Sequence, residues 1–186
     1  MTSSTLATTG LKAGVWDIDP VHSTLGFTVR HMMVSKVRGH FREFEGTINV
    51  AEDFTKSTGH GTVTTASIDT GTPDRDNHLR TNDFFDAENY PTIEYDAKGV
   101  RVKGDGYVVI GDITIKGVTK PLELDLEITG VGLDAYGKTR AGLNLTGQIN
   151  RQDFGVSWSA NLDGGGVVVS DKVNIELDLA AVLRSE

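Results

Sequence analysis

The chain of 186 residues contains no cysteine, which excludes disulfide bridges and thiolate chemistry. It lacks any run of 18 apolar residues, so no segment is predicted to cross a membrane as a helix. Lysine and arginine do not cluster and the formal net charge is −8, so the basic patches that bind nucleic acid are missing. P-loop and G-x-G-x-x-G motifs are also missing, and the glycines at 164–166 lack the lysine and helix start of a phosphate site.

The N-terminal stretch has no basic start and no apolar run of the length that a secretory signal needs. We therefore expect residues 1–13 to form a disordered tail rich in serine and threonine. Residues 14–186 are expected to form a single domain, since one β-barrel or sandwich routinely reaches this length. The expected location is cytoplasmic.

Apolar and polar residues alternate along most of the chain, and this period of two is typical of strands with one buried face. The alternation is clearest in residues 24–31, 44–50, 122–129, 141–150 and 173–179. Phe41 and Phe44 fall out of step by one residue, which predicts a bulge between them. About eight strands follow one another, a pattern that favours an antiparallel meander. Eight such strands close into a barrel with room for one small ligand.

One helical insertion interrupts the strands, at about residues 72–86. Thr72 is a residue type that caps helices, and Pro73 suits the first helical position. Asp76 and Arg80 are four residues apart and are expected to pair on the helix. The charged run at 75–80 is interpreted either as a catalytic loop or, as we favour, as charges that tie the insertion to the barrel rim.

The five histidines form no metal-binding motif, because no H-E-x-x-H or Cys–His pattern occurs. His22 and His31 are an odd number of residues apart, so on one regular strand they face opposite sides. One interpretation makes the histidines structural groups at the barrel ends. Another places His31 in the lumen beside Phe27 and Val29, where it meets the polar head of a ligand. We predict no metal and no cofactor.

Catalytic motifs are equally sparse. Asp19, His22 and Ser23 supply the residue types of a triad, yet neighbours in sequence rarely converge in that geometry. The nucleophile elbow G-x-S-x-G is absent. We therefore predict no catalytic residue.

Short motifs along the chain resemble those of the YceI-like family. They are W-x-[IL]-D-P-x-H-S at 16–23, F-x-V-x-H at 27–31, G-x-F-x-x-F-x-G at 39–46, S-I-D-T at 67–70, R-D-x-H-L at 75–79, D-F-F-D at 83–86, Y-P at 90–91, G-D-[IL]-T-I-K-G-V-T at 111–119 and R-x-D-F-G at 151–155. They occur in order between about Val15 and Leu183. The resemblance implies an extended lipocalin-like antiparallel barrel that binds a polyisoprenoid or similar long-chain amphiphile, without established catalytic machinery.

The predicted fold class is therefore all-β: an extended antiparallel eight-stranded lipocalin-like barrel with one short helical insertion. Strand alternation and the aromatic pair on the insertion supply the candidate residues that line the lumen: Phe27, Val29, His31, Phe41, Phe84, Phe85, Tyr95, Ile113, Ile115, Leu143, Leu145, Phe154 and Trp158. His31, Arg80 and Arg151 are predicted to meet an anionic or quinone head group at the mouth.

Three functions compete. The favoured one is non-catalytic binding, storage or carriage of a polyisoprenoid, quinone or fatty-acid-like lipid. The second is an enzyme that acts on a hydrophobic substrate with His31 or His78 as acid or base, and it requires a hydrogen-bonded histidine–carboxylate pair inside the pocket. The third is a structural barrel filled by its own side chains. A strand edge or a phenylalanine-rich rim would allow a homodimer.

Overall fold

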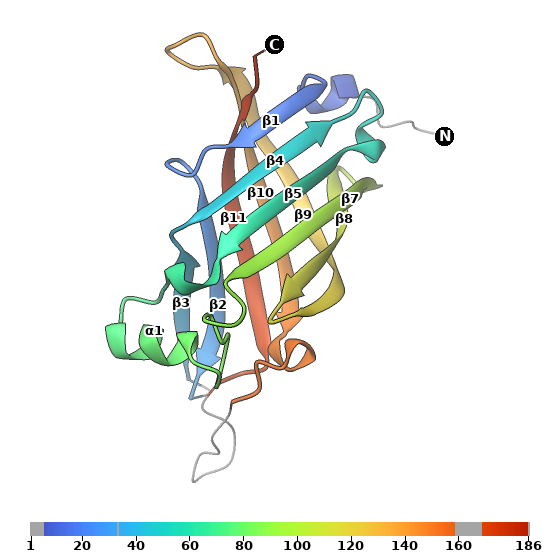
Figure 1. Ribbon diagram of the computed structural model, residues 1–186. Helices are drawn as coiled ribbons and strands as arrows, with labels where there is room; N and C mark the ends of the chain where they lie inside the picture. The colour runs from blue at the N-terminus through green and yellow to red at the C-terminus, as the bar shows by residue number, and fades with distance from the viewer. Residues whose placement is uncertain (1–5, 33, 159–168, 186) are drawn as a thin grey trace.

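The computed structural model describes residues 6–32, 34–158 and 169–185, and its strands form one antiparallel sheet that closes on itself (Figure 1). The strands are β1 (Gly14–Ile18), β2 (Thr24–His31), β3 (Ser35–Phe41), β4 (Phe44–Val50), β5 (Thr58–Thr64), β6 (Ile68–Asp69), β7 (Thr92–Lys103), β8 (Gly106–Ile115), β9 (Val118–Leu133), β10 (Thr139–Asn150) and β11 (Lys172–Leu183). The helices are α1 (Pro73–Arg80) and the 3₁₀ segments η1 (Leu6–Thr9), η2 (Phe54–Lys56), η3 (Thr65–Ser67) and η4 (Arg151–Phe154).

Among the described residues, eleven strand segments make eight strand paths around the barrel. β1 and β2 pair in turn with the two halves of β11, so they continue one another. In the same way β3 continues into β4 beside β2 and β1, and β5 continues into β6 beside β4 and β3. The eight paths then follow one another in sequence order, and β1 closes the ring on β11. The predicted antiparallel barrel is confirmed.

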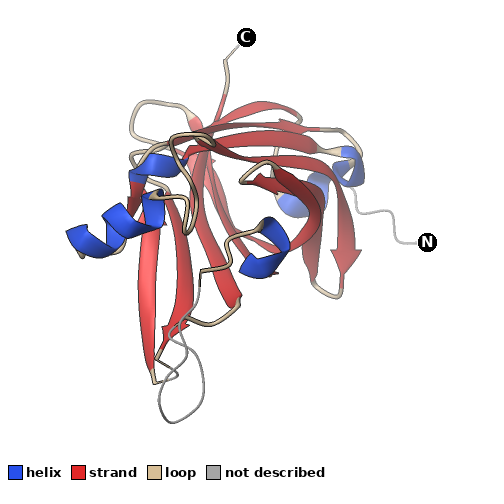
Figure 2. Ribbon diagram, turned by 60° about the horizontal axis from the view of Figure 1, so that its bottom comes forward, coloured by secondary structure: helices blue, strands red, loops and turns tan. Residues whose placement is uncertain are grey.

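Where a bulge was predicted between Phe41 and Phe44, the strand is interrupted instead, because β3 ends at the first residue and β4 begins at the second. Figure 2, turned so that the lower end comes forward, shows the strands arranged around the barrel axis with helical segments near its ends. No helix of the described residues is long and apolar enough to cross a membrane.

The helical insertion is shorter than predicted. α1 ends at Arg80, and turns rather than helix follow up to residue 91. The predicted pair of Asp76 with Arg80 is wrong. Asp76 is buried and its Oδ1 accepts from the amide and the hydroxyl of Thr70 at 2.9 and 2.5 Å. Arg80 instead donates to backbone carbonyls of η3 and β6 at 2.8 and 3.1 Å. These bonds hold the helix on the barrel rim.

The described part of the N-terminal segment starts at residue 6 with η1 and packs against the barrel. Leu6 packs against the core and Leu11 is buried in it, so the segment gains apolar contacts that its polar composition conceals. The indole Nε1 of Trp16 donates to the carbonyl of Lys12 at 3.0 Å and fixes the end of the segment. Residues 1–5 and the glycines at 164–166 lie outside the described residues.

Beside β6 the described strands no longer form a continuous hydrogen-bonded wall. Within the described chain β6 pairs with β3 alone, and β7 pairs with β5 and β8. α1 lies at this lower end, near β3 and β2 (Figure 1). Lys116 joins the segment after α1 to the segment after η4, because its Nζ donates to the carbonyls of Asn82 and Gly155, both at 3.2 Å.

Two inward-facing glycines have different surroundings. Gly39 pairs with Phe27 across β2 and β3, and the Phe27 ring occupies the space where a Cβ of Gly39 would lie. Gly61 lies on β5, and the nearest atom to a Cβ built there is a backbone oxygen 3.8 Å away. The first glycine is therefore covered by an aromatic ring, whereas the second leaves open space.

Gly39→Ala is expected to lower the free energy of unfolding by about 1–3 kcal/mol, because the new methyl group displaces the Phe27 ring. Gly61→Ala is the matched control, and its free energy of unfolding is expected to stay within about 1 kcal/mol of the parent or to rise. Urea denaturation followed by tryptophan fluorescence measures both. Equal losses in the two variants would contradict the packing argument.

Candidate functional site

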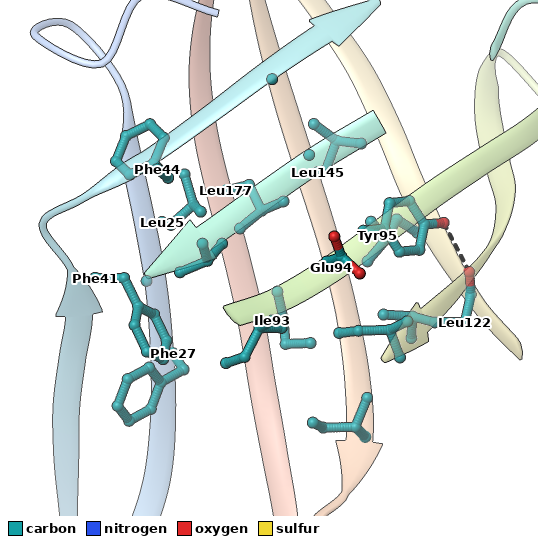
Figure 3. Close-up of a pocket in the computed structure, with 18 of the residues that line it drawn as sticks. Leu25, Phe27, Phe41, Phe44, Ile93, Glu94, Tyr95, Leu122, Leu145 and Leu177 are labelled. Carbon is teal, nitrogen blue, oxygen red and sulfur yellow. Dashed lines mark hydrogen bonds between the residues drawn. The ribbon is translucent and has the colours of Figure 1, made fainter. Parts of the chain in front are cut away.

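The barrel encloses a cavity of about 620 Å³, a size within the range of about 300–1,000 Å³ that is usual for small-molecule sites. Its wall is mainly apolar. In Figure 3, Phe27, Phe41 and Phe44 lie on the β2–β4 side, and Leu145 and Leu177 come from β10 and β11. The structural hypothesis requires a barrel that is filled by its own side chains. This cavity shows that the barrel is not filled in that way.

All of the residues predicted for the lumen line this cavity: Phe27, Val29, His31, Phe41, Phe84, Phe85, Tyr95, Ile113, Ile115, Leu143, Leu145, Phe154 and Trp158. Their contact with a ligand stays a prediction. Arg80 does not line the cavity. Its guanidinium donates to backbone carbonyls of η3 and β6 and so anchors α1, and its contact with a head group stays a prediction.

Arg151 lines the cavity but has a structural role. It is 5% exposed, and its guanidinium donates at 2.7–3.3 Å to four backbone carbonyls, those of Val156, Trp158, Val169 and Ser170. Burial lowers the pKa of Arg151 from its ordinary value. With its donors engaged, this side chain fastens the segments on either side of residues 159–168 to η4, and a head group would have to compete with these bonds.

The aromatic residues connect the insertion to the barrel. Phe41 on β3 lies between Phe27 and Phe85, with ring centroids 5.7 and 6.3 Å away. The ring centroids of Phe84 and Trp158 are 5.4 Å apart. The contacts of Phe85 with Phe41 and of Phe84 with Trp158 join the insertion to segments distant in sequence, so the insertion contributes to the cavity wall as the paired phenylalanines predicted.

Tyr95 supplies a polar group inside the barrel. Its hydroxyl donates to the carbonyl of Leu122 at 2.8 Å (Figure 3). Burial raises the pKa of the Tyr95 phenol well above its ordinary value, and the carboxylates of Asp112 and Glu123 raise it further. The phenol therefore stays protonated and its hydrogen is already donated.

Several lining residues were missed by sequence reasoning, although the signal was present for most of them. The alternation of β9 and β11 was recognised, but it was not carried over into the set of lumen residues. The residues concerned are Leu122, Leu124, Leu126, Ile175, Leu177 and Leu179. Leu11, Phe54 and Trp16 also line the cavity, and no strand alternation marked the first two.

The histidines fall into different environments. His22 is exposed and its Nδ1 lies 2.7 Å from Asp19 Oδ2, while the hydroxyl of Ser23 bonds to the backbone of Ala180. Asp19, His22 and Ser23 therefore form no triad. The Nδ1 atom of His60 lies 2.6 Å from Oδ1 of Asp96, and both side chains are at least half exposed. No group of three or more metal-ligating side chains gathers among the described residues.

His78 lies at the mouth of the cavity, because it lines the cavity and yet its side chain is 39% exposed. Its Nε2 lies 2.8 Å from Asp83 Oδ2. The ring packs nearly perpendicular to Phe84 and to Trp158, with centroids 5.0 Å away in both cases. This is a histidine–carboxylate pair of the kind that the enzymatic hypothesis requires, placed at the mouth.

Arg151→Met is expected to lower the free energy of unfolding by about 3 kcal/mol, because buried carbonyls lose their donors. Arg101→Met is the control. Arg101 pairs with Glu123 on the exposed outer surface, and its loss is expected to leave stability nearly unchanged. Chemical denaturation of the three proteins measures the difference. If Arg151→Met proved as stable as Arg101→Met, its anchoring role would be wrong.

Comparison with known proteins agrees with this architecture. The family model of the YceI-like domain matches residues 16–181. A UPF0312 protein of Photorhabdus laumondii is 38% identical over 139 residues, which cover 74% of this chain and 72% of that protein. A UPF0312 protein of Staphylococcus aureus strain N315 is 37% identical over 163 residues, or 85% of this chain and 91% of that protein.

Solved structures share the fold. The YceI protein of Campylobacter jejuni superposes with a TM-score of 0.71 at 29% identity and covers 84% of this chain and 90% of its own. A polyisoprenoid-binding domain from Saccharophagus degradans has a TM-score of 0.70 at 16% sequence identity. The match covers 91% of this chain and 98% of that domain. The latter similarity shows the fold alone. From the family model and the sequence identities together, the chain belongs to the YceI-like family.

Proposed function

We propose that this protein binds a long-chain isoprenoid or a related amphiphilic lipid, such as a quinone or fatty-acid derivative, and stores or carries it without changing it chemically. The apolar cavity of about 620 Å³ inside a closed barrel is the observation that carries the proposal. Membership of the YceI-like family supports it, as does the fold shared with a polyisoprenoid-binding domain.

The energetics favour an apolar tail as the main source of affinity. Each methylene group that leaves water contributes about 0.8 kcal/mol. A long chain would nominally exceed the limit of about −18 to −21 kcal/mol that non-covalent complexes reach, so ordering of the tail and imperfect fit must offset part of the gain. Specificity then depends on the few polar groups that line the cavity.

An enzymatic function is the second candidate, and the hydrogen bond between His78 and Asp83 favours it. Among the described residues, however, no serine or threonine hydroxyl is bonded to the His78 ring, and the Thr81 hydroxyl donates instead to the backbone carbonyl of His78, so no activated nucleophile is assembled there. A panel of ester and isomerisation substrates distinguishes the two candidates. Turnover that is lost in His78→Ala would favour the enzyme.

The first test is identification of bound lipid. Protein purified from its native host is expected to release a long-chain amphiphile on organic extraction, which mass spectrometry identifies. Gly61→Leu is expected to lower lipid affinity at least tenfold, because its four-carbon side chain takes cavity space from the tail and the loss of two buried methylene groups already costs about 1.6 kcal/mol. Thr146→Leu, on the exposed outer face of β10, is expected to bind as the parent does.

Two results would contradict the proposal. One is native protein that carries no lipid and binds no prenyl or acyl chain in titration. The other is Gly61→Leu that binds as tightly as Thr146→Leu. The cytoplasmic location and the homodimer stay predictions, which cell fractionation and sedimentation test.

A further inference from the structure

We propose that His78 recognises the head group of the ligand, and that this head group is a hydrogen-bond donor such as the free hydroxyl of a long-chain alcohol. The inference rests on the proposed function and deepens it. It assigns the polar end of the ligand to the mouth formed by α1 and the segment at Trp158.

The arginines near the mouth that come from α1 and η4 are already engaged. Arg80 lies outside the cavity lining, and Arg151 is taken up by four backbone carbonyls. Arg75 lines the cavity, but its Nε and Nη2 donate to the hydroxyl and the carbonyl of Thr70 at 2.8 and 2.9 Å. His78 differs because Asp83 engages one of its ring nitrogens, while Phe84 and Trp158 only pack against the ring.

Three contacts orient the His78 ring before any ligand arrives. Asp83 holds Nε2 at 2.8 Å, and Phe84 and Trp158 pack against the ring at 5.0 Å, near right angles. A side chain fixed in this way loses little conformational freedom when a ligand binds, so its hydrogen bond contributes more of its energy to affinity.

The bond to Asp83 also determines which nitrogen carries the proton. A carboxylate only accepts, so Nε2 of His78 must donate to it. In the neutral imidazole Nδ1 then carries a lone pair and accepts. Within the described part of the chain Nδ1 has no hydrogen-bond partner. Its complement is an O–H group, and an ether or ester oxygen in the same position would leave two acceptors facing each other.

The test compares two probes that differ only in this donor, geranylgeraniol and its methyl ether, titrated into the delipidated full-length protein. The parent is expected to bind the alcohol about three- to tenfold more tightly, the effect of one hydrogen bond. In His78→Phe, which keeps an aromatic ring beside Phe84 and Trp158, affinity for the alcohol is expected to fall to that for the ether, while affinity for the ether stays unchanged.

Two further variants separate recognition from packing. His31→Phe tests the alternative that His31, which also lines the cavity, meets the head group, and if His78 does so instead the variant keeps the preference for the alcohol. Asp83→Asn supplies an amide that either donates or accepts, so it no longer fixes the tautomer and the preference is expected to shrink. A merely structural role of Asp83 would lower both affinities equally.

Distinct results overturn the inference. Equal affinity of the parent for both probes does so, as does a preference that His78→Phe leaves intact. A preference that is lost in His31→Phe assigns the head group to His31 instead. If the parent binds neither these probes nor an acyl chain, the proposed function itself fails, and this inference with it.

Discussion

Closure of the sheet between β1 and β11 is the constraint on which the rest of the structure depends. Trp16, Asp17 and Ile18 pair with the last residues of β11, and the ion pair of Asp17 with Arg184 lies beside this seam. Once the ladder is closed, alternate side chains on every strand must point to a common interior. The inward-facing apolar residues then surround a space that is shielded from water, and the ligand hypothesis follows from that geometry.

The lower end of the barrel is built by different means. There the backbone ladder gives way to long polar side chains that bond to carbonyls: Arg80 to η3 and β6, Arg151 to the chain after η4, and Lys116 to Asn82 and Gly155. Arg80 and Arg151, which were predicted to meet an anionic head, are thereby bonded to backbone carbonyls, and their contact with a head group stays a prediction. Their N–H groups donate to backbone carbonyls, and the buried carbonyl of Val156 would lack a donor without Arg151.

Much of the barrel was predictable from sequence because a period of two translates directly into which face a residue occupies. Leu143 and Leu145 were placed correctly against the cavity for this reason. The functions of Arg80 and Arg151 were not predictable, because their carbonyl partners belong to other elements and leave no local pattern. The pair of His78 with Asp83 was hidden for a similar cause, since it forms across the end of α1, where helical spacing no longer applies.

The stretch of wall beside β6 has a kinetic consequence. Because β6 has a ladder partner on one side only in the described chain, α1 and the turns after it can detach without breaking any hydrogen bond between barrel strands. Local opening there requires only the loss of the side-chain anchors and aromatic contacts, which is less than the global free energy of unfolding. Amide exchange along residues 71–91 should therefore outpace exchange in the strands, and the rate at which the cavity opens to solvent becomes adjustable independently of thermal stability.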